Sequence, residues 1–198
     1  MTTTTPLAIL VFPDAEVLDV MGPYEAFSLA THDQGTPAFR VRLAAREPIV
    51  TLRNGLRVVA DDPLDRADTS GILLVPGGPG VRRLVDDLEL REWIAARGAN
   101  AECVLSVCTG AWLLGVAGLL HELPATTHHR TFDDFARHAP TARVQRGVRY
   151  VDAGRVLTSG GVSAGIDLAL HVIERRLGVA ARARVETTME WGDAWRGG

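Results

Sequence analysis

Lysine is absent from this 198-residue chain, because all 21 of its basic residues are arginine. The protein therefore cannot form a Schiff base through a lysine amine, and it cannot use the phosphate-binding lysine of a Walker loop. Cysteine is also scarce. Cys103 and Cys108 lie five residues apart, a spacing that forms no CxxC motif, no zinc ligand set and no disulfide framework. We therefore expect no metal.

Long apolar runs and clusters of basic residues are lacking too. No run approaches the roughly 20 residues of a membrane span, and the N-terminus has neither the basic region nor the apolar core of a signal peptide. The net charge of −3, without a basic cluster, argues against a nucleic-acid partner. We expect a cytoplasmic protein that binds neither membrane nor nucleic acid, folded as one domain over residues 1–198.

Short apolar runs alternate with helical patterns along the chain. Apolar strands without polar alternation are typical of a parallel sheet that is covered on both faces. Asn54-Gly55 lies between two apolar segments and predicts a hairpin. The pattern predicts an α/β fold, a flavodoxin-like doubly wound sandwich with a mostly parallel sheet. Its expected strands are residues 7–12, 39–44, 71–75, 104–107, 144–150 and 156–158, and its expected helices 23–30, 81–98, 111–118, 131–138, 164–177 and 179–191.

The segment 104–118, VLSVCTGAWLLGVAG, has the outline of a strand, a sharp turn and a helix. A residue on such a turn lies at the carboxyl edge of the sheet, where open α/β sheets bind their ligands. The following helix begins close to Cys108, and a helix N-terminus favours a thiolate over a thiol. Cys108 is therefore interpreted as a nucleophile on an elbow; the alternative is a small buried hydrophobe. Cys103, inside the strand, is interpreted as structural.

Other polar and glycine-rich segments should reach the same edge of the sheet. Residues 76–80, PGGPG, follow a strand, and residues 159–163, SGGVS, form a second junction between a strand and a helix. Asp19 precedes the predicted helix that starts at Pro23, where it serves either as a site residue or as a helix cap. His128 is either a general base or a structural histidine, and it has no partners at metal-ligand spacing.

Five segments together resemble the ThiJ/PfpI superfamily, in order and over nearly the whole chain: LDVMGPYEAF, LLVPGGPG, SVCTGAWLLGVAGLL, ATTHH and LTSGGVSAGIDLALHVIE. The resemblance implies a class I glutamine amidotransferase-like fold with its nucleophilic cysteine on the elbow. The chain is most similar to the isocyanide hydratase branch, which shares the D-x-x-G-P-Y-E stretch, the C-T-G elbow and the A-T-T-H segment. Thr109 stands where the peptidase members carry a histidine, so a peptidase mechanism is not expected.

The resemblance implies conversion of an isocyanide to an N-substituted formamide through a covalent thioimidate, without a cofactor, in a homodimer whose interface lies near the cysteine. The alternative is a ligand or redox sensor, because the same signature occurs in regulators of the AraC type. Cys108 would be the nucleophile and Asp19 the acid, with Glu25 or Glu16 as alternatives. The backbone N–H groups of Gly78 and Thr109 would hold developing negative charge. The expected pocket residues are Gly77, Glu25, His128, Gly160, Gly161 and Val162.

Overall fold

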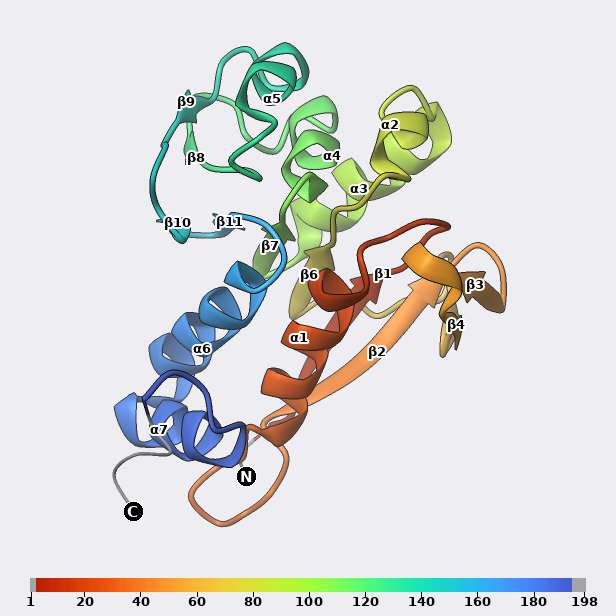
Figure 1. The fold of residues 1–198 in the computed structure, drawn as a ribbon. Coiled ribbons are helices and arrows are strands. Elements are labelled where there is room, and N and C mark those ends of the chain that lie inside the picture. Colours follow the sequence, from red (N-terminus) through yellow and green to blue (C-terminus); the bar gives the residue numbers. More distant parts are fainter. Residues whose placement is uncertain (1–2, 194–198) are drawn as a thin grey trace.

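A seven-stranded sheet forms the centre of the molecule in the computed structural model, which describes residues 3–193 (Figure 1). Its strands lie in the order β10-β11-β7-β6-β1-β2-β5, and every neighbouring pair is parallel except β10 and β11. The strands are β1 (Thr5–Leu10), β2 (Phe39–Ala45), β5 (Asp62–Pro63), β6 (Ile72–Val75), β7 (Cys103–Val107), β10 (Tyr150–Ala153) and β11 (Val156–Ser159).

The central strands are apolar because helices cover both faces of the sheet. Every residue of β6, β7 and β11 is buried, so the polar alternation of a half-exposed strand is missing. In Figure 1, α1 (Val17–Leu29), α6 (Ala164–Leu177) and α7 (Val179–Thr188) lie over one face. Helices α3 (Leu88–Asn100) and α4 (Gly110–Val116) lie over the other, beside the short α2 (Val81–Leu84) and α5 (Phe132–His138). The predicted doubly wound α/β fold is confirmed.

Helix α1 begins at Val17, six residues earlier than predicted. Gly22 and Pro23 are inside the helix and do not mark its start. A Cβ atom on Gly22 would lie 2.8 Å from Cγ1 of Ile166, so the glycine permits close packing of α1 on α6. The prediction that Asp19 precedes the helix was therefore wrong, because Asp19 lies in its first turn.

Two other boundaries also differ from the predictions. The expected helix 81–98 is divided into α2 and α3, because the Asp87 side chain accepts a hydrogen bond from Leu90 N at 2.9 Å and caps a new helix. The expected strand 144–150 is mostly irregular. It contributes Val144 to the short β9 (Arg143–Val144), turns at Gly147 with φ of 73°, and joins the sheet again only at Tyr150.

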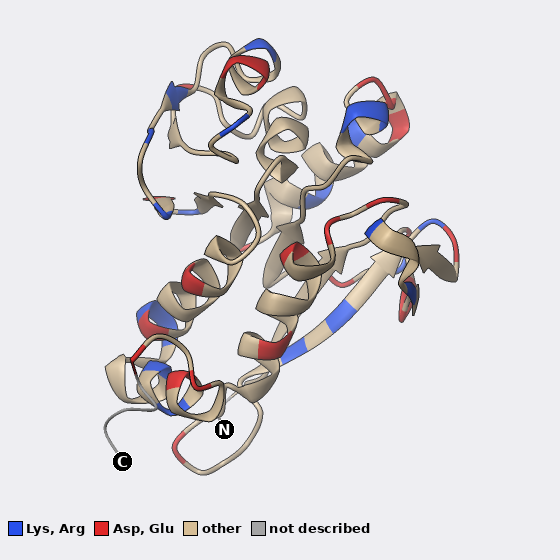
Figure 2. Ribbon diagram, in the orientation of Figure 1, with Lys and Arg blue, Asp and Glu red and all other residues tan. Residues whose placement is uncertain are grey.

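Two small sheets flank the central one. The predicted hairpin is confirmed: β3 (Ile49–Thr51) and β4 (Arg57–Val59) are antiparallel, and Asn54 and Gly55 have left-handed φ angles in the connecting turn η1 (Arg53–Gly55). β8 (Pro124–Ala125) pairs with β9. Figure 2 shows acidic and basic residues interspersed over the outer elements. Among the described residues, no helix is long and apolar enough to cross a membrane.

Candidate active site

Cys108 lies on the sharp turn between β7 and α4. Its φ of 59° is left-handed, a conformation that non-glycine residues rarely adopt and that often marks a functional turn. The turn passes close to the neighbouring loop, because a Cβ atom on Gly110 would lie 2.2 Å from the carbonyl oxygen of Val75. The Cys108 N–H donates to the carbonyl oxygen of Gly160 at 3.0 Å. This is the geometry of a nucleophile elbow at the carboxyl edge of the sheet.

Asp19 is fully buried beside the elbow. Its two carboxyl oxygens accept hydrogen bonds from the backbone N–H groups of Gly77 and Val162, each at 3.0 Å. These donors come from the two glycine-rich loops that the sequence placed at this edge, and Val162 has a left-handed φ of 56°. Burial raises the pKa of Asp19 to about 7, against the lowering effect of both N–H donors. A carboxyl group that titrates near neutral pH is suited to proton transfer.

The Cys108 thiol lies close enough to the Asp19 carboxyl to lower the pKa of that carboxyl. Cys108 is only 7% exposed, and burial, followed by the charge of Asp19, raises the pKa of its thiol. The expectation of a thiol with a lowered pKa was therefore wrong. The helix N-terminus lowers the pKa of a thiol only locally. Desolvation and the neighbouring Asp19 carboxylate raise the pKa of Cys108 by more. The thiol loses its proton only when a nearby group accepts it.

Thr109 and Gly78 contact each other next to Cys108. The Thr109 side-chain oxygen accepts a hydrogen bond from Gly78 N at 3.0 Å. The Gly78 N–H group thus has the Thr109 hydroxyl as its partner in this structure, and its role in holding negative charge stays a prediction. Thr109 lowers the pKa of the Cys108 thiol and so favours its thiolate form, against the larger effect of burial. A Cβ atom on Gly77 would lie 2.5 Å from Thr109 N, so the loop packs directly against the elbow.

The two alternative acids lie elsewhere. Glu25 is exposed on α1, and the structure does not bring it to Cys108. Glu16 pairs with Arg53 from the hairpin turn, and its charge raises the pKa of Asp19. Arg53 N also donates to Ala15 O at 2.9 Å, which brings the hairpin against the loop that precedes α1. Of the three candidate acids, Asp19 is the one that contacts the thiol.

The ATTHH segment, residues 125–129, also contacts the elbow. The Thr127 hydroxyl donates to the carbonyl oxygen of Cys108 at 2.8 Å, and both residues are buried. The His128 ring packs on Gly161, where a Cβ atom would lie 2.1 Å from its Cδ2. Burial lowers the pKa of His128, and its Nδ1 accepts a hydrogen bond from Arg130 N at 3.3 Å. His128 thus lines this region and stays mostly neutral at pH 7.

Cys103 provides an internal comparison. It is buried on β7 with 1% exposure, and burial raises its pKa as well. No carboxyl group is hydrogen-bonded to it in the part of the chain that the structure describes, so it lacks the proton acceptor that Cys108 has. Residues 3–193 contain no group of three or more histidine, cysteine or acidic residues that could hold a metal ion.

The fold and the elbow together define a doubly wound α/β protein with a cysteine at the carboxyl edge of its sheet. Residues 6–175 match the DJ-1/PfpI family, and the chain belongs to this family. It is 32% identical over 189 residues to isonitrile hydratase from Pseudomonas putida, an alignment that covers 95% of this chain and 79% of the relative.

Two further comparisons describe the range of the family. A ThiJ/PfpI family protein from Pseudomonas syringae superposes with a TM-score of 0.86 at 27% identity, over 96% of this chain and 76% of the other. The transcriptional regulator GbdR from Pseudomonas aeruginosa is 26% identical over 87% of this chain, which corresponds to 47% of the regulator. Proteins similar to this chain therefore include both an enzyme and a regulator.

Sequence reasoning missed two features of the site. The Thr127 hydroxyl contacts Cys108 across 19 residues, and the pair of Glu16 and Arg53 joins the hairpin to α1 across 37 residues. Neither contact follows from a local pattern. The only signal for Thr127 was its place in the ATTHH segment, which carried the family resemblance.

Proposed function

We propose that this protein hydrates an isocyanide to an N-substituted formamide, with Cys108 as the nucleophile and Asp19 as the proton carrier. The observation that carries the proposal is the burial of the Cys108 thiol beside Asp19, a carboxyl group that two backbone N–H groups hold in place and whose pKa is about 7. The similarity to isonitrile hydratase supports the choice of reaction. The class of enzyme is a lyase that uses no cofactor.

In the first step, Asp19 takes the proton of the Cys108 thiol as the sulfur attacks the terminal carbon of the isocyanide. Asp19 then gives this proton to the same carbon. The product is a thioimidate, in which the former isocyanide carbon is bonded to sulfur, hydrogen and nitrogen. Covalent attack divides one difficult addition of water into two easier steps. The Thr109 N–H stabilises the sulfur while it carries negative charge.

In the second step, water adds to the thioimidate carbon. Asp19 accepts a proton from the water and delivers it to the nitrogen, which gives a tetrahedral adduct. The C–S bond then breaks, and the hydroxyl proton returns through Asp19 to the sulfur. The formamide leaves, and Cys108 is again a thiol. One water is consumed for each isocyanide, so atoms and protons balance over the cycle.

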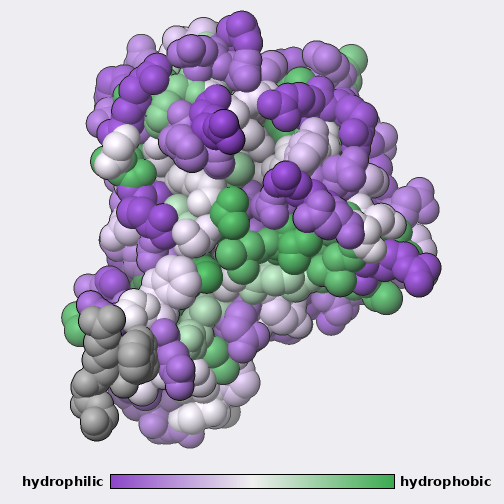
Figure 3. Space-filling model, in the orientation of Figure 1, coloured by the Kyte–Doolittle hydropathy of each residue, from purple (hydrophilic) through white to green (hydrophobic). Residues whose placement is uncertain are grey.

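A homodimer is the second part of the proposal. Exposed apolar side chains lie on α1 and on the hairpin, with exposures of 37% for Leu18, 45% for Leu56 and 71% for Val59. Figure 3 shows hydrophobic side chains gathered across this region. Such an exposed apolar patch is typical of a protein–protein interface. A second copy placed there would lie close to Glu16 and Arg53, beside the loop that leads to Asp19.

The test is turnover of a small aryl isocyanide, followed by the absorbance change as the formamide forms. Cys108→Ala should abolish turnover, and Cys103→Ala should leave it nearly unchanged. Equal activity of the Cys108→Ala variant and the original protein would refute the role of the nucleophile. No turnover of any isocyanide by the unmodified protein would refute the reaction.

A ligand or redox sensor is the second candidate, favoured by the similarity to GbdR. A sensor would bind a small molecule at Cys108 without turnover, or would record oxidation of the thiol in the reducing cytoplasm. Saturable binding of an isocyanide without formamide release, or rapid oxidation of Cys108 by dilute peroxide in a protein without turnover, would favour this candidate over the enzyme.

A further inference from the structure

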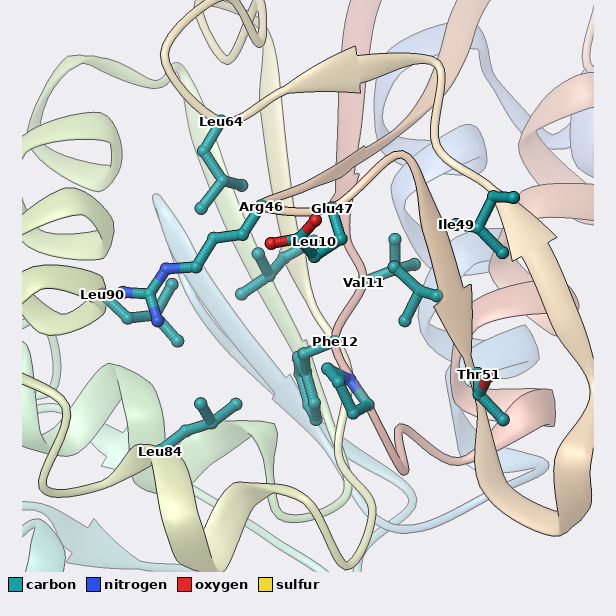
Figure 4. A pocket seen from close by; sticks show the side chains of 12 residues that line it. Leu10, Val11, Phe12, Arg46, Glu47, Ile49, Thr51, Leu64, Leu84 and Leu90 are labelled. Atoms are coloured by element: carbon teal, nitrogen blue, oxygen red, sulfur yellow. The ribbon is translucent and has the colours of Figure 1, made fainter.

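A cavity of about 290 Å³ lies at the carboxyl end of β1, apart from Cys108 (Figure 4). Its walls include Val11 and Phe12 after β1, Ile49 and Thr51 on the hairpin, Leu84 on α2, and Leu90 on α3. None of the residues that hold Cys108 or Asp19 lines it. The cavity is mostly apolar and close to the lower size limit of small-molecule sites, which is roughly 300 Å³.

The charged groups at the rim limit what this cavity can bind. The Arg46 guanidinium is held by Asp87 at 2.5 and 2.9 Å and by Glu89 at 3.2 Å, so its hydrogen bonds are directed away from a ligand. Glu47 also lines the cavity. The charged lining is therefore Glu47 and an Arg46 whose charge is already paired with Asp87 and Glu89 outside the cavity. An anion would meet repulsion without a free cationic partner, whereas a neutral or cationic molecule would not.

We propose that this cavity is a binding site for a small aromatic or branched aliphatic molecule that is uncharged or carries an amine. The apolar body of the ligand would contact Phe12, Ile49 and Leu84, and an amine would lie towards Glu47. Burial of the apolar surface of the ligand supplies the affinity. This site is separate from Cys108, so the proposal stands independently of the proposed function.

Phe12, in the wall of the cavity, is linked by hydrogen bonds to the loops that hold Asp19. Ala15 N donates to Phe12 O at 3.1 Å, and Glu16 N donates to Gly77 O at 2.9 Å. Gly77 N in turn donates to Asp19. A ligand that displaces Phe12 therefore acts on a chain of three hydrogen bonds that ends at the carboxyl partner of Cys108. We expect occupancy of the cavity to change the alkylation rate of Cys108 at least twofold.

The experiment uses three probes that share one ring system: indole, which is neutral, tryptamine, which is cationic, and indole-3-acetate, which is anionic. Each is titrated into the full chain with isotope-labelled methyl groups. Indole and tryptamine should shift the methyl resonances of Ile49, Leu84 and Leu90 in a saturable manner. Indole-3-acetate should bind at least tenfold more weakly than tryptamine.

Leu84→Trp is the test variant, because the larger side chain would fill the cavity from α2. Leu88→Trp is its matched control, since Leu88 is 67% exposed and does not line the cavity. Binding should be lost in the first variant and kept in the second. If Leu84→Trp does not fold, Thr51→Trp fills the cavity from the hairpin side. Cys108→Ser should bind the probes normally, which separates this site from failure of the proposed reaction.

Several results would overturn the proposal. They are the absence of saturable shifts, shifts that cluster around Cys108, equal binding by Leu84→Trp, and contacts in solution between these methyl groups and a second copy of the chain. An unchanged alkylation rate of Cys108 at saturating indole would overturn the coupling to Asp19.

Discussion

Replacement of Asp19 by asparagine should stabilise the protein at alkaline pH while it removes activity. The Asp19 side chain is fully buried, and its pKa is raised from 3.8 to about 7. Below pH 3.8 the carboxyl is neutral in both the folded and the unfolded chain. Between pH 3.8 and 7 the unfolded chain releases the proton and the folded chain retains it. The free energy of unfolding therefore falls as the pH rises through this window, and the deficit is constant above pH 7.

The size of the effect follows from the two pKa values. The difference between 3.8 and about 7, at roughly 1.4 kcal/mol for each pH unit, is about 4 kcal/mol above pH 7. Asparagine removes this cost. However, its amide NH₂ would face one of the N–H donors, Gly77 or Val162, and an unsatisfied buried donor costs about 1–3 kcal/mol. We expect Asp19→Asn to be about 2 kcal/mol more stable at pH 8 and no more stable than the original protein at pH 5.

Urea unfolding at pH 5, 6, 7 and 8, followed by tryptophan fluorescence, measures this difference. Turnover of an isocyanide by the same variant should fall at least a hundredfold, the scale of general acid–base catalysis. Glu25→Gln is the control, because Glu25 is exposed on the same helix, and it should change neither quantity. If Asp19→Asn were destabilised at pH 8 by the same amount as at pH 5, the carboxylate would be ionised in the fold without a cost, and the reasoning would be refuted.

Three further outcomes are expected. Iodoacetamide should modify Cys108 and not Cys103, and the rate should keep rising above pH 8 because burial and Asp19 raise the pKa of the thiol; peptide mass mapping against pH checks this. Gly78→Ala should cost several kcal/mol in urea unfolding, since its φ is 129° and its Cβ would lie 2.4 Å from a backbone nitrogen, whereas Gly35→Ala, with open space around it, should cost about 1 kcal/mol. Thr127→Val should cost about 1–2 kcal/mol by the same measurement, through the lost hydrogen bond to the elbow carbonyl.

The sheet and the elbow were predictable from the sequence because their signals are local. Each central strand is a short apolar run; β6, β7 and β11 are followed by Pro76-Gly77, Cys108 and Gly160, and the parallel order brings those ends to one edge. The meeting of Asp19 with residues 76–80 and 159–163 therefore followed from topology. The hairpin at Asn54 and Gly55 was predictable for a similar reason, since that dipeptide readily adopts left-handed φ angles.

The start of α1 was not predictable in the same way. Its N-cap residue, Glu16, makes no capping hydrogen bond through its side chain, so the usual signal is absent. Gly22 and Pro23 have low helix propensity and favoured a boundary. Packing against Ile166, more than 140 residues later, overrides that preference. The pKa of Cys108 was misjudged for the same physical reason, because desolvation depends on the whole fold and the helix N-terminus does not.

The two backbone donors to Asp19 set an order in which the site can be assembled during synthesis. Gly77 follows Asp19 by 58 residues and Val162 follows it by 143. A ribosome exposes Cys108 before it exposes Val162, so a nascent chain holds the cysteine while its carboxyl partner still lacks one of its two anchors. The pair becomes complete only after the loop before α6 has left the exit tunnel. Proton transfer between Cys108 and a fully anchored Asp19 is thereby delayed until most of the polypeptide has been translated.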